Sequence, residues 1–369
     1  MGPLAGIRVL EVGGIGPNPF AGMLLADMGA EVVRIDRAEG VMLAGASEPM
    51  LRGRQTLAVD LKRDAGREAV LALAGHADAL IEGFRPGVME RLGLGPADAH
   101  ARNPRLVYGR VTGFGQDGPL ARTAGHDINY ISLAGALGAS QRRGEKPMFA
   151  VNLVGDYGGG AMLLAFGVVC GLLEARRSGQ GQVIDAAMID GVALMLSLIH
   201  GMRAAGLWEP EPGTNLLDSG AHFYEVYTAA DGGHVAVGAL EPQFYGRLLE
   251  LLQIAPEEMP QHERARWPEF KERFAAVFAS RTSEEWRALL EGEDACATIV
   301  RSPFDAHEHP QLAARATFIE LDGLRQPAAA PRFSRTPGQA RPAQHDPEAA
   351  LARWDLSDAE RSLVLGALS

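Results

Sequence analysis

Two short motifs supply an imidazole and a carboxylate, side chains that often transfer protons in enzymes. In GHDINY, His126 precedes an apolar pattern typical of a helix, and Asp127 is a plausible N-cap of that helix. The positive end of the helix dipole favours the neutral, basic form of an imidazole at this position. A histidine at a helix start is more often structural than catalytic, so this motif alone leaves both interpretations open.

The second motif, NLVGDYGGGAMLL, places Asp156 directly before the glycine-rich start of the most apolar helix pattern in the chain. An aspartate is common there simply as a helix cap. The glycines 158–160 cost a helix about 1 kcal/mol each relative to alanine, which indicates that something approaches the backbone closely. Asn152, four residues before Asp156, is placed to hydrogen-bond the carboxylate and hold its orientation.

A third carboxylate, Glu241, follows a predicted strand, AVGAL, and precedes Pro242. A lone carboxylate at a strand end is usually solvated. It gains a catalytic role if it meets an imidazole, because a carboxylate partner fixes the tautomer and stabilises the imidazolium that forms when the base takes a proton.

A glycine-rich turn after the first predicted strand, GIGPNP at residues 14–19, imitates a dinucleotide-binding fingerprint. Pro19 occupies the position where a third glycine would permit close packing of helix and strand, and Pro17 removes a backbone donor. Nicotinamide binding is therefore disfavoured. A tight turn followed by a proline-started helix explains the same residues.

The elements that position these motifs alternate between short β-branched runs and helical patterns. Strands are expected at residues 7–12, 31–35, 56–59, 79–82 and 106–111, with helices such as 19–28 and 65–74 between them. This alternation predicts an α/β fold with a parallel, doubly wound sheet, in which ligands bind beyond the carboxyl ends of the strands.

Beyond about residue 205 the sequence predicts a smaller α+β domain. FYEVYTAADGGHVAVGAL has the form of a hairpin that turns at 231–233, and helices are expected near 244–252, 270–279 and 283–290. QPAAAPRFSRTPGQARP is expected to be extended because each proline biases its neighbour away from the helix, and a terminal helix follows around 358–365. We therefore assign residues 1–204 to a large Rossmann-like domain, 205–325 to the small domain, and 326–369 to a segment that returns to the large domain.

Composition and charge narrow the classes of partner. The chain has 369 residues, 47% of them hydrophobic, a formal net charge of -11 and no run of Lys and Arg, so it should fold, and nucleic acid is not an expected partner. The two cysteines, Cys170 and Cys296, are expected to be buried reduced thiols, and no spacing of His or Cys suits a metal site. The apolar run from Gly158 to Leu173 is shorter than a bilayer requires, so we expect a buried helix and no membrane span. These features favour a cytoplasmic location.

Taken together, the motifs resemble the alpha-methylacyl-CoA racemase branch of the family III CoA-transferase (CaiB/BaiF) superfamily over nearly the whole chain. The resemblance rests on GPLAGIRVLEVGGIGPNPFAGMLLADMGAEVVRIDR at residues 2–37, GHDINY at 125–130, NLVGDYGGGAMLLAFG at 152–167, GQVIDAAMIDG at 181–191 and APRFSRTPG at 330–338. All occur in the family's order, and GHDINY with GDYGGG is typical of the racemase branch.

The resemblance implies racemisation of 2-methylacyl-CoA thioesters through an enolate, a reaction of lipid metabolism that needs neither a metal nor a redox cofactor. His126 and Asp156 would be the acid/base groups on opposite faces of the α-carbon, paired with Glu241 and Asn152, and the thioester oxygen would lie near the backbone N–H of Asp127. The coenzyme A portion of the substrate would contact Arg37, Ala58, Val59, Asp60, Leu61, Lys62, Gly83, Arg85, Arg91, Gly125 and Tyr130. The family also implies an interlocked homodimer.

Two alternatives remain. A CoA transferase on the same fold would use Asp156 as a nucleophile that forms an anhydride with the acyl group. That chemistry needs the carboxylate but not the histidine, and transferases usually carry an aromatic residue at the position of His126. A non-enzymatic acyl-CoA binder is the other alternative, and the complete set of His126, Asp156, Asn152 and Glu241 argues against it.

Overall fold

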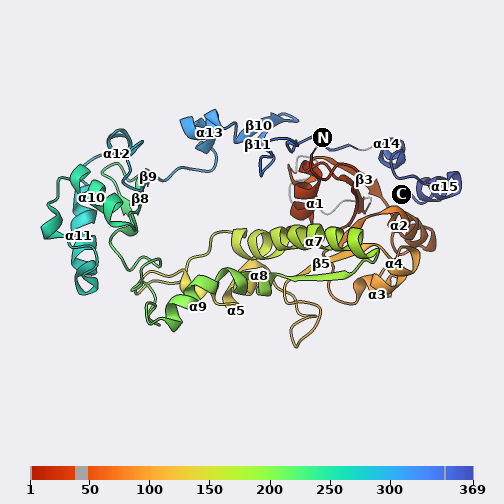
Figure 1. Ribbon diagram of the computed structural model, residues 1–369, viewed down its shortest axis with the longest axis horizontal. Helices are drawn as coiled ribbons and strands as arrows, with labels where there is room; N and C mark the ends of the chain where they lie inside the picture. The colour runs from red at the N-terminus through yellow and green to blue at the C-terminus, as the bar shows by residue number, and fades with distance from the viewer. Residues whose placement is uncertain (1, 38–48, 345, 369) are drawn as a thin grey trace. The chain divides into compact units, whose positions relative to one another are not determined.

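The computed structural model describes residues 2–37, 49–344 and 346–368 (Figure 1). The chain forms two compact units. The first consists of Met1–Ala134, Ala150–Met195 and Pro310–Ser369, and the second of Gly135–Phe149 and Leu196–His309. We describe each unit by itself.

The first unit is built on a six-stranded parallel sheet, which confirms the predicted α/β class. The strands run in the order β3-β2-β1-β4-β5-β6. Their bounds are β1 Arg8–Val12, β2 Glu31–Asp36, β3 Arg54–Ala58, β4 Ala79–Glu82, β5 Val107–Thr112 and β6 Val183–Ala187. The first five lie within two residues of their predicted ends. The sixth was not predicted, because its sequence, VIDAA, is half-exposed and lacks the continuous apolar run of a fully buried parallel strand.

Helices cover both faces of this sheet, so it is doubly wound. One buried cluster joins the strands to α2 (Asp64–His76), α4 (Pro96–Arg102), α14 (Pro347–Leu351) and α15 (Asp358–Gly366). Another joins them to α1 (Pro17–Asp27) and α7 (Leu163–Ser178). The unit also contains α3 (Val88–Arg91), α5 (Asp127–Leu133), α8 (Met188–Met195), α13 (Pro310–Ala314) and a hairpin of β10 (Phe318–Leu321) and β11 (Leu324–Pro327).

The second unit packs helices against a small antiparallel sheet. Its strands are β7 (Tyr224–Thr228), β8 (His234–Gly238) and β9 (Ala297–Ile299), and Thr228 pairs with His234 across the predicted hairpin turn. The helices are α6 (Ala136–Ala139), α9 (Ser197–Ala204), α10 (Pro242–Leu251), α11 (Trp267–Phe278) and α12 (Ser283–Leu290). Buried aromatic rings such as Phe223, Phe274 and Trp286 dominate its core, and the α+β character of this part is as predicted.

The contacts divide the chain differently from the predicted domain boundaries. Residues 135–149 fall in the second unit, where Arg142 forms an ion pair of 2.8 Å with the buried carboxylate of Glu225. Residues 310–325 fall in the first unit, and they include β10, which pairs with β11. Arg52 donates to the Gln326 side chain and to the carbonyl oxygen of Pro327 in β11, which anchors this hairpin. Both connections join residues far apart in the sequence, so local composition carries no sign of them.

The glycine run at 158–160 allows two helices to touch through their backbones. The segment Leu153–Met162 is π-helical, and α8 lies against it. A Cβ added to Gly159 would lie 2.8 Å from the carbonyl oxygen of Met188, and one added to Gly191 would clash with the backbone of Gly159. The close approach predicted from the cost of the glycines is therefore confirmed, and the approaching group is the backbone of α8.

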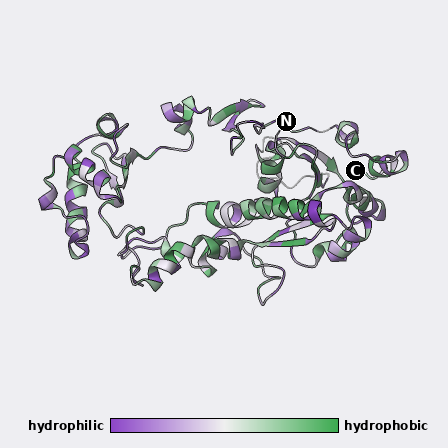
Figure 2. Ribbon diagram, viewed as in Figure 1, coloured by the Kyte–Doolittle hydropathy of each residue, from purple (hydrophilic) through white to green (hydrophobic). Residues whose placement is uncertain are grey.

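The most apolar segment is longer and less buried than predicted. The π-helical segment continues into α7, and the resulting 26-residue helix is long and apolar enough to cross a membrane by length and composition alone. Such a helix is weak evidence for a membrane, because core helices of soluble proteins meet the same criteria. Only 44% of its most apolar window is buried, and Figure 2 shows α7 as mainly hydrophobic. Its exposed side chains include Met162, Phe166 and Leu173.

The prediction that both cysteines are buried is wrong. Cys170 on α7 and Cys296 in the second unit are both exposed and both free.

Gly191→Ala tests the backbone contact between α8 and the π-helical segment. The added methyl group clashes with backbone that has no room to move, so we expect the free energy of unfolding to fall by about 1–3 kcal/mol. Gly75→Ala in α2 is the matched control, because a Cβ there meets nothing within 4 Å and alanine favours a helix by up to about 1 kcal/mol. Urea unfolding measures both variants, and equal stabilities would contradict the contact.

Candidate active site

The strand order changes direction between β1 and β4, and in doubly wound sheets ligands bind at this point, beyond the carboxyl ends of the strands. The turns that follow these two strands meet there. A Cβ added to Gly83 would lie 3.2 Å from the Cβ of Asn18. The turn at 13–19 opens α1 with prolines in its first turn, as the sequence predicted.

A buried ion cluster holds the turn after β1. Glu11 of β1 pairs with Arg34 of β2 and Arg54 of β3, and all three side chains are fully buried. The guanidinium of Arg34 also donates to the carbonyl oxygens of Gly13 and Gly14. Mutual pairing offsets the cost of removing these charges from water. The sequence patterns did not predict this cluster, because its only signal is a charged residue within or just before each of three short strand patterns.

Asp127 connects the two segments that carry the acid/base candidates. Its carboxylate accepts the backbone N–H groups of Gly155 at 2.6 Å and of Asp156 at 2.8 Å. The predicted N-cap role is therefore wrong: Asp127 is the first residue of α5, and His126 is the N-cap. The reason is that the π-helical segment offers two free backbone donors that the carboxylate reaches. Charge-assisted bonds of this kind are about twice as strong as neutral ones.

Asp156 lies inside the π-helical segment and does not cap a helix. The N-cap of that segment is Asn152, whose amide donates to Oδ2 of Asp156 at 3.1 Å, the hydrogen bond expected from their spacing. A Cβ added to Gly16 would lie 3.5 Å from the same oxygen, so the carboxylate faces the turn after β1. Burial raises the pKa of Asp156 above its ordinary value, while Asn152 and the charge of His126 oppose the rise.

His126 exposes its side chain at the start of α5. Its backbone N–H donates to the side chain of Asn129 at 3.0 Å, which fixes the start of α5. Its charge acts on the ionisation of Asp156, so the two candidates interact electrostatically. Among the residues that the structure describes, none accepts a hydrogen bond from the backbone N–H of Asp127. The Asp127 side chain thus links the start of α5, where His126 and the unpaired N–H lie, to the segment that carries Asp156.

Glu241 lies in the second unit as the N-cap of α10. His126 belongs to the first unit, so the pairing of the two remains a prediction. Within its own unit, Glu241 acts on Cys296. Burial raises the pKa of the Cys296 thiol, and the negative charge of Glu241 raises it further.

Gly125 and Tyr130, two coenzyme A candidates, stabilise the GHDINY loop itself. The Tyr130 hydroxyl donates to the carbonyl oxygen of Gly125, and its ring packs edge-on against Phe114 with 5.1 Å between centroids. A Cβ on Gly125 would lie 2.7 Å from the Tyr130 ring. Burial raises the pKa of Tyr130 to about 12. Both residues therefore have a structural role that depends on no ligand.

The other coenzyme A candidates also follow carboxyl ends of strands. They are Arg37 after β2, Ala58 at the end of β3 with Val59 to Lys62 after it, and Gly83, Arg85 and Arg91 after β4. Arg37, Asp60, Lys62, Arg85 and Arg91 are exposed, whereas the Val59 side chain is in the core at 2% exposure and leaves only its backbone for a ligand. A Cβ on Gly87 would lie 3.3 Å from Nη1 of Arg91, so this guanidinium lies close over the turn before α3.

One titratable group at this edge was not predicted. Glu82 ends β4, is fully buried, and accepts hydrogen bonds from Arg110 at 2.9 Å and from the backbone N–H of Phe84 at 2.6 Å. Burial raises its pKa to about 7, against the opposing charge of Arg110. It shapes the turn that carries Gly83.

Over the described residues, no three His, Cys, Asp or Glu side chains are grouped to hold a metal ion.

Comparison with known proteins finds similarity over most of the chain. The signature of CoA-transferase family III matches residues 4–349. Alpha-methylacyl-CoA racemase of Mus musculus is 47% identical over 90% of this chain and 87% of its own length, and that of Homo sapiens is 43% identical over 90% of each. The crystal structure of a CaiB/BaiF family protein from Brucella suis superimposes with a TM-score of 0.79 at 25% identity, covering 96% of this chain and all of the other.

Asp127→Asn and Asp156→Asn should have opposite effects on stability. Asp127→Asn weakens two charge-assisted bonds and should lower the free energy of unfolding at pH 7 by about 1–3 kcal/mol. Asp156 has a raised pKa in the fold, so the folded protein binds more protons than the unfolded chain above pH 3.8, and stability falls as the pH rises through the folded pKa. Asp156→Asn removes that fall.

Urea unfolding from pH 4 to pH 7 measures both effects. Asp156→Asn should be at least as stable as the parent chain at pH 7. A larger loss of stability in Asp156→Asn than in Asp127→Asn would show that the Asp127 carboxylate does not hold the two segments together.

Proposed function

This chain belongs to CoA-transferase family III, and on that premise we propose that it is a racemase which interconverts (R)- and (S)-2-methylacyl-CoA thioesters. Identities of 47% and 43% to the mouse and human racemases support the proposal. The observation that carries it is the pair of hydrogen bonds from Gly155 and Asp156 to Asp127, because they hold a carboxylate beside the start of the helix that bears the imidazole.

In the proposed reaction, His126 and Asp156 flank the α-carbon of the thioester. One of them takes the α-proton, a planar enolate forms, and the other returns a proton to the opposite face. The roles exchange for the reverse reaction. Positioned groups of this kind typically accelerate proton transfer by about 10²- to 10⁴-fold each. The raised pKa of Asp156 supports this role, since a carboxyl that is easier to protonate serves both as base and as acid.

The enolate oxygen needs a donor aimed at its developing charge. We assign this role to the backbone N–H of Asp127, which donates a hydrogen bond to no described residue. A donor of this kind contributes about 3 kcal/mol to the transition state. Because the Asp127 side chain also fixes Asp156, the same residue positions the donor and one of the two bases.

Coenzyme A is proposed to lie along the carboxyl edge of the sheet. Arg37, Arg85 and Arg91 are exposed there, and guanidinium groups suit phosphate oxygens because they donate two parallel hydrogen bonds. The segment at 58–62 adds the exposed side chains of Asp60 and Lys62. The acyl-CoA is the substrate, and no separate cofactor is part of the proposal.

The second candidate is a CoA transferase with Asp156 as nucleophile, as the name of the family allows. The carboxylate is oriented by Asn152 and suits that role too. An exposed imidazole whose charge acts on Asp156 favours the racemase, because anhydride chemistry makes no use of it.

We further propose that the enzyme is a homodimer in the cytoplasm. Phe166 and Leu173 are exposed on α7, and Met162 is exposed at the end of the π-helical segment before it. Apolar patches of this kind on soluble proteins usually mark interaction surfaces. Two free, exposed cysteines are compatible with a reducing compartment.

Single-base variants test the two-base mechanism. In deuterium oxide the parent enzyme should exchange the α-proton of both (R)- and (S)-2-methylacyl-CoA and racemise each. His126→Gln and Asp156→Asn should each lower racemisation by about 10²- to 10⁴-fold, and each should retain exchange only of the enantiomer whose proton faces the remaining base. Mass spectrometry follows deuterium, and chiral chromatography follows configuration.

His76→Gln in α2 is the control for loss of a histidine, and it should racemise normally. Normal racemisation by either active-site variant would contradict the two-base assignment. If the parent enzyme acts only when a second carboxylic acid is added, and Asp156→Asn abolishes that activity while His126→Gln does not, the transferase is the correct function.

Phe166→Glu tests the dimer. A charge in an apolar interface should dissociate it, so light scattering should show the mass falling from twice the chain mass to 39.2 kDa. Leu363→Glu places the same charge at an exposed site on α15 and should leave the mass unchanged. A dimer that survives Phe166→Glu would exclude this face of α7 as the interface.

A further inference from the structure

The loop after β4, which carries two arginines of the proposed coenzyme A site, is held by side chains of β4 and β5. Glu82, the last residue of β4, accepts the backbone N–H of Phe84 at 2.6 Å. Nε of Arg110 on β5 donates to the same carboxylate at 2.9 Å, and its Nη1 and Nη2 donate to Glu90 of α3 at 2.8 and 3.3 Å. One guanidinium thus connects the residue before the loop to the short helix that follows it.

This Glu82–Arg110–Glu90 bridge is buried at its centre and open to solvent at its outer end. The side chains of Glu82 and Arg110 are 0% and 7% exposed, and that of Glu90 is 45% exposed. Burial raises the pKa of Glu90, but the hydrogen bonds from Arg110 outweigh burial and lower the pKa below its ordinary value. Glu90 is therefore ionised at neutral pH, and its paired hydrogen bonds with Arg110 fix orientation as well as distance.

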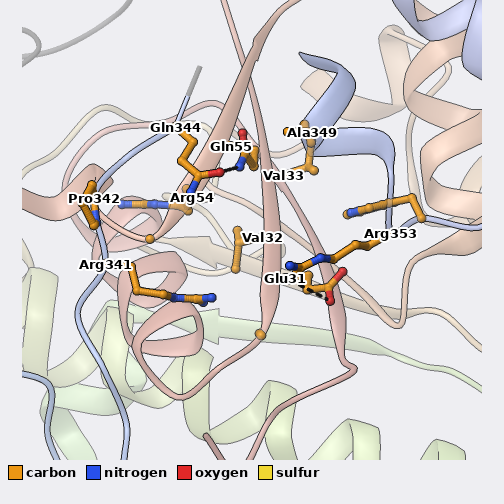
Figure 3. A pocket seen from close by; sticks show the side chains of 14 residues that line it. Glu31, Val32, Val33, Arg54, Gln55, Arg341, Pro342, Gln344, Ala349 and Arg353 are labelled. Carbon is orange, nitrogen blue, oxygen red and sulfur yellow. Dashed lines mark hydrogen bonds and ion pairs between the residues drawn. The ribbon is translucent and has the colours of Figure 1, made fainter. Parts of the chain in front are cut away.

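The two arginines on the loop have no partner of their own. Arg85 and Arg91 are exposed, and within the described part of the chain neither side chain makes a hydrogen bond or an ion pair. Arg353, at the amino ends of the strands, differs because it lies 3.7 Å from Glu31 (Figure 3). The positions of Arg85 and Arg91 therefore depend on the backbone that carries them, and the bridge fixes that backbone.

We propose that Arg110 is a positioning residue for coenzyme A: through Glu82 and Glu90 it fixes the loop so that Arg91 meets the phosphate oxygens. This inference rests on the proposed function, which places Arg91 against coenzyme A. Arg110 is buried and its guanidinium is occupied by two carboxylates, so it acts through the loop and not on the ligand. A loop that is ordered before binding loses less entropy on binding, which increases affinity.

Removal of Glu90 separates this role from a simple effect of charge, because the two predict opposite changes in affinity. Glu90 is negative and precedes Arg91 in α3. If Glu90 acted only by its charge, its loss would favour the binding of phosphate groups. If the bridge positions Arg91, the same loss weakens binding.

Glu90→Ala and Glu90→Gln test the bridge in the full chain, with coenzyme A as the calorimetric probe and 2-methylacyl-CoA as the substrate. Both variants leave the buried pair of Glu82 and Arg110 intact, so the fold is preserved. Glu90→Ala should raise the Kd of coenzyme A and the KM of the thioester about tenfold and leave kcat unchanged. Glu90→Gln keeps one acceptor for Arg110 and should show a smaller rise.

Glu31→Ala is the matched control, because it removes a carboxylate that pairs with an arginine at the opposite edge of the same sheet. It should leave Kd and KM unchanged. In an Arg91→Gln background, Glu90→Ala should no longer weaken binding, because the guanidinium that the bridge positions is absent. The inference is overturned if Glu90→Ala binds coenzyme A as tightly as the parent chain or more tightly, or if its loss of affinity persists in the Arg91→Gln background.

The calorimetric measurement separates this inference from the proposed reaction. A parent chain that binds coenzyme A without racemising thioesters refutes the racemase, while the Kd values of the variants still decide the role of the bridge. A parent chain that does not bind coenzyme A refutes both.

Discussion

The Asp127 carboxylate is the constraint on which the rest of the site depends. It accepts two backbone N–H groups from the π-helical segment at 2.6 and 2.8 Å, and it begins the helix whose N-cap is His126. A proton-transfer site tolerates little error in the distance between its groups. One buried side chain therefore fixes the backbone at the start of α5, next to His126, against the backbone that carries Asp156, although the two segments are about 30 residues apart in sequence.

Two features of the structure around this link restrict the site: helices whose backbones touch, and a buried cluster of charged side chains. Gly159 and Gly191 bring the π-helical segment and α8 into backbone contact, and π-helical turns occur frequently at functional sites. On the other side of Asp156, the ion cluster of Glu11, Arg34 and Arg54 holds the turn that faces its carboxylate. Each feature has a cost in free energy. Glycines lose more conformational entropy on folding than other residues, and buried charges lose their hydration. Both features restrict movement at the site.

One surface of the first unit is unusual for a monomer. The apolar side chains of Phe166 and Leu173 are exposed on α7, and Met162 is exposed just before that helix. Apolar groups that remain in contact with water are stabilised when a second apolar surface covers them.

The sequence by itself determined the class of the sheet, five of its six strands and the hairpin of the second unit, because these depend on local periodicity and turn chemistry. Its motifs also supplied His126 and Asp156 as the proposed acid/base pair. It also predicted the hydrogen bond from Asn152 to Asp156, since that pair is four residues apart. Only the tertiary structure decided the role of the Asp127 carboxylate, the burial of Glu11, Arg34 and Arg54, the assignment of residues 135–149 to the second unit, and the exposure of α7. Each of these depends on contacts between distant residues, and the composition around a single residue does not specify which distant group will reach it.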